Sequence, residues 1–244
     1  MKQVVNYFLV IFIVIGAACN TAQKNSDAKP VVADGYTYGP ASEDGIGKFY
    51  WGREISYVMG AAGSEWLERD SRNEEENTDL AVQNLPLQPT SVVADIGAGT
   101  GYYSFRIARR IPKGKLYAVD IQDEMIRQLS ARKKNEGDSI ITIVKGSESG
   151  PNLPANSTDL ALMVDVYHEL AYPKELLQAL HKALRPGGKL VLLEYRGEDP
   201  SIPIKPLHKT TVAQLNRELE ANGFKLSVNG DFLPIQHFLV YIKK

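Results

Sequence analysis

The pattern of hydrophobic and polar residues changes near Pro86. From there on, short apolar runs alternate with segments that have a helical pattern. The runs are nearly continuous in Val, Ile and Leu, which is typical of parallel strands buried on both faces. The pattern predicts one doubly wound α/β domain over residues 86–244, with a mostly parallel seven-stranded sheet, an antiparallel edge and helices on both faces. We expect strands at 91–96, 115–121, 139–146, 159–166, 189–195, 225–233 and 236–244, and helices at 102–111, 123–135, 173–188 and 211–223.

Two regions with weaker patterns come before this domain. Residues 46–85 have a helical pattern, with Ser64 as an N-cap before Trp66, so we expect a helical cap there. Residues 19–45 are small and polar, with prolines at 30 and 40 and no apolar period. This composition predicts a flexible tether.

Residues 1–18 have the pattern of a secretory signal: an early lysine, an apolar run over 4–15, and small residues directly before Cys19. The run is shorter than the ~20 apolar residues that a membrane-spanning helix needs. Small residues before a cysteine resemble the lipobox of bacterial lipoproteins, although Gly16 departs from that pattern. The resemblance implies an extracytoplasmic protein held at the membrane by lipid on Cys19. An uncleaved anchor helix is the alternative, and it places the domain on the same side.

Composition narrows the classes of partner and site. The 28 Lys and Arg residues nearly balance the 29 Asp and Glu residues, so the chain has no excess of positive charge for nucleic acid, and we expect no such partner. Cys19 is the single cysteine, which excludes an intramolecular disulfide and a multi-cysteine zinc site. The four histidines are scattered without a His-x-x-x-His pair, so no metal site is expected.

A glycine-rich turn follows the first strand of the α/β domain, in the sequence Asp95-Ile96-Gly97-Ala98-Gly99-Thr100-Gly101. Glycines at this turn allow a ligand to approach the backbone closely. A dinucleotide fingerprint would need its third glycine at position 102, where Tyr102 stands, so a nicotinamide cofactor is the weaker interpretation. Asp95 also disfavours a pyrophosphate and favours an ammonium or sulfonium group. Asp120 ends the next strand, where a carboxylate can accept both hydroxyls of a ribose.

Together these residues resemble the class I methyltransferases that use S-adenosylmethionine. The segments DLALMVDVYHEL (159–170) and LRPGGKLVLLEYR (184–196) are similar to the family's fourth-strand and fifth-strand motifs. The resemblance covers residues 86–244 and implies a Rossmann-like fold. It further implies contacts with each part of S-adenosylmethionine. The methionine end would contact Asp95, Gly97, Gly99 and Gly101, and the ribose would contact Asp120. The adenine would contact Ile121, Ser147 and Glu148, and Asp165 at the end of the fourth strand would face the cofactor. The family often has an acidic residue at this strand end that contacts the adenine amine, and here the loop reads KGSES rather than an Asp-containing sequence.

The methyl group of a sulfonium is already activated, so the protein must align donor and acceptor and take a proton where the acceptor carries one. Candidate catalytic residues at the same rim are His168 as base, Tyr167 in the acceptor pocket and Glu194 after the fifth strand. Glu169 and His208 are further candidate bases. A structural hydrogen-bonding role is the alternative for each histidine.

Together, the methyltransferase resemblance and the lipobox resemblance imply a membrane-tethered methyltransferase that acts on an unidentified acceptor, expected to be a small molecule. Two alternatives stay open: a non-catalytic lipoprotein that binds an adenosyl ligand on the same fold, and an NAD(P)-dependent reductase. Export away from the cytoplasm, where S-adenosylmethionine is made, conflicts with the enzymatic interpretation, and the sequence leaves that conflict open.

Overall fold

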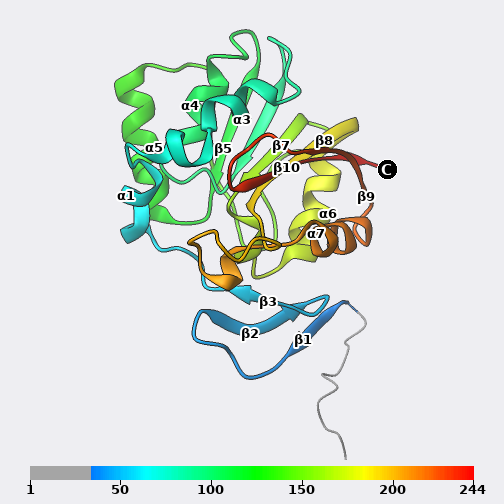
Figure 1. Ribbon diagram of the computed structural model, residues 1–244. Helices are drawn as coiled ribbons and strands as arrows, with labels where there is room; N and C mark the ends of the chain where they lie inside the picture. The colour runs from blue at the N-terminus through cyan, green and yellow to red at the C-terminus, as the bar shows by residue number, and fades with distance from the viewer. Residues whose placement is uncertain (1–33) are drawn as a thin grey trace, which may run out of the picture.

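The computed structural model describes residues 34–244, so the predicted signal, Cys19 and most of the predicted tether lie outside the described residues. The described chain forms a seven-stranded sheet with helices on both faces and a separate three-stranded sheet beside it (Figure 1). Within this part of the chain, no helix is both long enough and apolar enough to cross a membrane.

The main sheet has the strand order β6-β5-β4-β7-β8-β10-β9. Its parallel strands are β4 (Val92–Ile96), β5 (Lys115–Asp120), β6 (Ile141–Lys145), β7 (Thr158–Val164) and β8 (Leu184–Tyr195). Strand β10 (Gln236–Lys243) inserts antiparallel between β8 and β9 (Phe224–Gly230). The predicted fold class is confirmed. The inserted antiparallel strand also departs from the dinucleotide-binding order, in which the sixth strand simply follows the fifth.

Helices cover both faces of this sheet because successive strand residues point to opposite sides. Val93 and Leu162 pack on one face, in a core shared with α3 (Thr78–Asn84), α4 (Tyr102–Ala108) and α5 (Asp123–Glu136). Ala94 and Met163 pack on the opposite face with α6 (Pro173–Ala183) and α7 (Val212–Glu220). This double burial explains the nearly continuous apolar runs in the sequence.

The small sheet corrects the expectation of a tether up to residue 45 and a helical cap from residue 46. It contains β1 (Tyr36–Tyr38), β2 (Gly45–Tyr50) and β3 (Arg53–Ser56). Trp51 and Gly52 join β2 to β3, and both have positive φ, as a two-residue hairpin turn requires. Tyr36, Tyr50 and Ile55 form the buried core of this small sheet.

Helices do occupy the second half of the predicted cap, in short pieces. They are η1 (Ala61–Gly63), α1 (Ser64–Leu67), α2 (Arg72–Glu76) and α3. A second correction concerns the helix predicted at 173–188. Helix α6 ends at Ala183, and Leu184–Gly188 begin strand β8. Arg185 precedes Pro186, which disfavours a helical backbone at that point.

Candidate active site

The glycine turn between β4 and α4 has the open backbone that its sequence predicts. Gly97, Gly99 and Gly101 all have positive φ. A Cβ on Gly97 would lie 2.6 Å from a methyl carbon of Val166, so a larger residue cannot fit there without displacing β7's end. The turn is fixed to β5, because the amides of Gly97 and Ala98 both donate to the carbonyl oxygen of Val119.

Asp120 is the acidic residue at the end of β5, and its carboxylate binds the glycine turn. One oxygen accepts the amide of Gly99 at 2.9 Å, and the other accepts the amide of Gln122 at 2.8 Å. Asp120 is buried, at 5% exposure, yet it lines a cavity of about 540 Å³. Each carboxylate oxygen has a second lone pair. The side chain can therefore hold the turn and also accept a hydroxyl group from a ligand.

The cavity lies beyond the carboxyl ends of the parallel strands, between the main sheet and the segments that cover it. Several short connections enclose it: the turns after β4, β5, β6 and β7, the segment before α1, and the loop between β8 and α7. The sequence-predicted residues that line it are Gly97, Gly99, Asp120, Ile121, Ser147, Glu148, Asp165 and His168. The structure thus brings most of the predicted cofactor residues to one cavity.

Asp95 and Gly101 do not line this cavity. Asp95 lies beside Gly97 and Arg72 at a smaller hollow of about 30 Å³. Its carboxylate accepts a hydrogen bond from the Ser104 hydroxyl at 2.5 Å. Burial, with a smaller contribution from the negative charge of Asp120, raises the pKa of Asp95 to about 6. Gly101 caps the start of α4 with its left-handed backbone.

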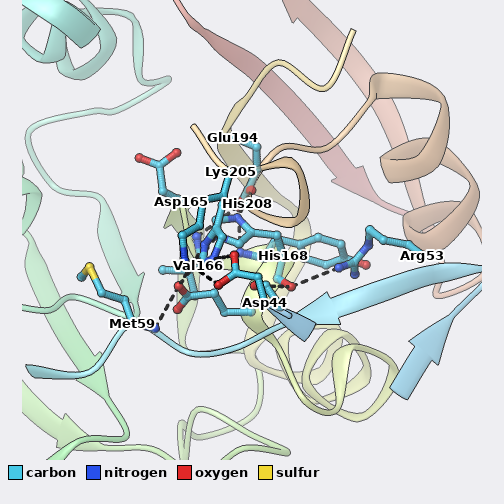
Figure 2. A network of polar contacts seen from close by, with 12 residues as sticks. Asp44, Arg53, Met59, Asp165, Val166, His168, Glu194, Lys205 and His208 are labelled. Carbon is cyan, nitrogen blue, oxygen red and sulfur yellow. Dashed lines mark hydrogen bonds and ion pairs between the residues drawn. The ribbon is translucent and has the colours of Figure 1, made fainter. Parts of the chain in front are cut away.

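A cluster of polar side chains also lines the cavity (Figure 2). His168, in the 3-10 turn η2 (Tyr167–Glu169), places Nε2 3.1 Å from Nδ1 of His208, in η3 (Pro206–His208). Glu169 Oε1 lies 3.8 Å from that nitrogen of His168 and 3.6 Å from that nitrogen of His208. We call His168, Glu169 and His208 the His–Glu–His cluster.

Carboxylates also stand behind the two imidazole rings. Nδ1 of His168 is 2.6 Å from Glu194 Oε2, and Nε2 of His208 is 2.9 Å from Asp44 Oδ2 (Figure 2). Lys205 pairs with the other oxygen of Asp44 at 2.7 Å, and this hydrogen bond lowers the pKa of Asp44. Asp44 comes from the loop before β2, so the small sheet completes the cluster.

Burial shapes the acid–base behaviour of the cluster. It raises the pKa of Glu169 to about 7, although nearby His168 and a hydrogen bond from the Met59 amide act in the opposite direction. Burial lowers the pKa of His208, and the neighbouring His168 lowers it further. Both shifts favour neutral groups at neutral pH, so the cluster can exchange a proton near physiological conditions.

Two of the predicted catalytic residues do not line the cavity. Tyr167 is fully buried, and its hydroxyl donates to Glu218 of α7 at 2.8 Å. Glu194 is fully buried beneath His168, and it accepts the amides of Val166 and Tyr167 as well as facing the imidazole. The geometry gives both residues a positioning role behind His168.

The covering segments add residues that sequence reasoning did not select. Tyr57, Val58 and Trp66 line the cavity and are also 53%, 45% and 46% exposed, which gives its mouth an apolar rim. Arg72 lines it from α2 and forms an ion pair with buried Glu76. These positions are distant from the glycine turn in sequence, and the fold brings them to the same cavity.

Comparisons with known proteins agree with this architecture. Residues 94–190 match a sequence model described as a methyltransferase domain. A demethylmenaquinone methyltransferase of Chlamydia trachomatis is 30% identical over 145 residues, which are 58% of this chain and 62% of that protein. An uncharacterized methyltransferase-like protein of Schizosaccharomyces pombe is 30% identical over 126 residues, 52% of this chain and 46% of that protein. The chain therefore spans about half to three fifths of the length of these curated relatives.

A solved structure shows the same fold. The crystal structure of a SAM-dependent methyltransferase from Aquifex aeolicus matches 77% of this chain and 100% of its own, with a TM-score of 0.72 and 22% identity. The chain thus has the fold of S-adenosylmethionine-dependent methyltransferases, and its residues 94–190 carry the sequence pattern of a methyltransferase domain.

Proposed function

We propose that the protein is an S-adenosylmethionine-dependent methyltransferase that acts on a small-molecule acceptor. The observation that carries this proposal is one cavity lined by two chemically different groups of residues. The glycine turn and Asp120 form the first group, and the His–Glu–His cluster forms the second. A cofactor held by the first group would share the cavity with side chains that can bind an acceptor and take its proton.

The residues of the first group fit S-adenosylmethionine. The bare backbone at Gly97 and Gly99 leaves room where side chains would otherwise stand. Asp120 would accept the ribose hydroxyls, and Ile121, Ser147 and Glu148 would border the adenine. Asp95 lies outside the cavity, in the adjoining hollow beside Gly97, so it would act on the positive charge of the methionine end through space. The bound cofactor supplies a methyl group on an activated sulfonium.

The second group would receive the acceptor. The apolar rim of Tyr57, Val58 and Trp66 suits an acceptor with an apolar body, and His168 and Glu169 lie where its reacting group would be held. Glu169 is suited to accept a proton because burial brings its pKa to about 7. The demethylmenaquinone methyltransferase among the relatives supports a small-molecule acceptor.

We also propose that lipid on Cys19 tethers this domain to a membrane from the extracytoplasmic side. The support is the signal-like pattern of residues 1–18, which end in small residues directly before the cysteine.

Calorimetric titration of the full chain with S-adenosylmethionine and S-adenosylhomocysteine tests the cofactor assignment. We expect both ligands to bind, and we expect Asp120→Ala to weaken both by more than about tenfold, because a charge-assisted hydrogen bond contributes roughly 1.5–3 kcal/mol. Asp138→Ala is the matched control, since Asp138 accepts an amide two residues ahead, as Asp120 does, but lies away from the cavity. The control should bind like the parent.

Two results would count against the proposal. One is the absence of binding heat for both ligands with a folded parent protein. The other is equal affinity of Asp120→Ala and the parent, which would remove the ribose assignment. Methyl transfer from the labelled cofactor to candidate acceptors of low molecular mass then tests the reaction itself.

A further inference from the structure

We infer that the His–Glu–His cluster is a binding site for a divalent first-row transition metal ion such as Zn²⁺. The site consists of His168 Nε2, His208 Nδ1 and a carboxylate oxygen of Glu169. The expectation from sequence was that no metal site exists, because the histidines are 40 residues apart in the chain and lack a helical ligand spacing. The fold removes that separation.

The three ligand atoms have the spacing that one metal ion needs. They form a triangle with sides of 3.1, 3.6 and 3.8 Å. A point equidistant from the three atoms lies about 2.0 Å from each, which matches zinc–nitrogen and zinc–oxygen bond lengths.

The carboxylates behind the two rings leave the inner ring nitrogens facing one another. Glu194 faces Nδ1 of His168 at 2.6 Å, and Asp44 faces Nε2 of His208 at 2.9 Å. A carboxylate beside a ring nitrogen favours the proton on that nitrogen. The two inner nitrogens, 3.1 Å apart, would then both be acceptors beside a third acceptor, Glu169. Three converging acceptors require a cation between them, either a proton or a metal ion.

The surroundings favour the metal ion over the proton. Metal-binding histidines commonly give their other ring nitrogen to a carboxylate, which fixes the ring and raises its basicity. Here His168 forms such a hydrogen bond with Glu194, and the outer nitrogen of His208 lies 2.9 Å from a carboxylate oxygen of Asp44. Glu194 is itself fixed by the amides of Val166 and Tyr167.

Ligand chemistry selects the class of ion. Two imidazoles and one carboxylate suit Zn²⁺, Fe²⁺, Ni²⁺ or Cu²⁺, whereas Mg²⁺ and Ca²⁺ prefer ligand sets made of oxygen atoms. All three residues line the large cavity, so an ion held by them keeps coordination positions open toward it. An acceptor with an oxygen, nitrogen or sulfur atom could bind at those positions.

The test measures metal binding directly. The purified full chain is stripped of metal with a chelator, dialysed, and titrated with Zn²⁺ or Co²⁺. Elemental mass spectrometry measures the bound metal, and visible absorption follows the binding of Co²⁺. We expect one equivalent of either ion to bind, and no binding of Mg²⁺ under the same conditions.

Variants assign the binding to the cluster. His208→Ala should lose the stoichiometric site, and Asp44→Asn should weaken it by about 10- to 100-fold, because it removes only the carboxylate behind the ring. His181→Ala is the control, since His181 lies on α6 against Phe224 and outside the cluster. Circular dichroism confirms that each variant is folded.

Three results would overturn the inference. The first is the absence of an equivalent of bound Zn²⁺ or Co²⁺ in the folded parent. The second is equal loss of binding in His181→Ala and His208→Ala. The third is a ring-nitrogen NMR spectrum, unchanged by Zn²⁺, that shows an imidazolium proton shared between His168 and His208. These readouts do not use S-adenosylmethionine, so the metal site and the proposed methyl transfer can fail independently.

Discussion

The buried carboxyl group of Asp95 affects the stability of the protein even without a bound ligand. It is 3% exposed, the Ser104 hydroxyl donates a hydrogen bond to it, and Arg72 and Asp120 are nearby charges that act on it. Burial raises its pKa from 3.8 to about 6. The folded protein therefore holds the proton more tightly than the unfolded chain does, so ionisation of Asp95 costs stability that a bound cationic group would restore.

The sign of the resulting pH dependence follows from that shift. The contribution of Asp95 to stability is fully present below its unfolded pKa and is lost as pH rises through about 6. Relative to Asp95→Asn, the parent should lose about 2 kcal/mol of unfolding free energy between about pH 4.5 and 7.5. Urea unfolding of both proteins at the two pH values measures this difference. A constant difference between them would contradict the raised pKa.

At the scale of elements, an ion pair fastens the small sheet to the domain that carries the glycine turn. Arg53 of β3 donates two hydrogen bonds to Glu218 of α7, at 2.8 and 2.9 Å, and a third to the carbonyl oxygen of His168 at 3.1 Å. The Glu218 side chain is fully buried and that of Arg53 is 9% exposed. The contact thus ties β3, α7 and the turn that carries His168.

Loss of this ion pair should be costly. Arg53→Ala leaves a buried carboxylate without its cation, and we expect it to lower the unfolding free energy by about 3–5 kcal/mol. Arg127→Ala is the control, because Arg127 pairs with Glu124 at an exposed surface, and the change there should be at most about 1 kcal/mol. Thermal and denaturant unfolding compare the two. Equal effects of both substitutions would show that the small sheet is not held by this pair.

At the scale of the whole molecule, segments distant in sequence share one cavity. The small sheet brings Asp44, the loop after β8 brings His208, and the strand ends bring Asp120 and His168. The main sheet forms the rigid base, and the covering segments determine what enters. The proposed tether would add the membrane as a surface near which this cavity works.

The tether can be tested on the full chain in bacterial cells. If lipid on Cys19 anchors the protein, the parent should sediment with membranes and Cys19→Ala should move to the soluble fraction. Thr21→Ala, two residues away, should behave like the parent. Intact-mass measurement of the parent should show an added lipid. A parent without lipid mass, and a Cys19→Ala variant that still sediments, would contradict the lipoprotein proposal.

Most of the main domain could be predicted from the sequence because its signals are local. Strands buried on both faces need apolar residues at every position, and amphipathic helices need a period of 3.6, so both are visible in short windows. The glycine turn and Asp120 could be found for the same reason, since each directly follows a strand. The small sheet could not be predicted in this way, because strands such as β1 and β3 are only three or four residues long and have no run of apolar residues.

The amino-acid sequence alone determined the strand and helix alternation, the glycine turn and the acidic residue that holds it, since neighbouring residues create these features. Only the tertiary structure decided which side chains face the cavity. It placed Tyr167 and Glu194 behind His168 and brought His208 and Asp44 beside it. The physical reason is that such contacts depend on packing between elements, whose free energy is spread over many residues and leaves no pattern in any one segment.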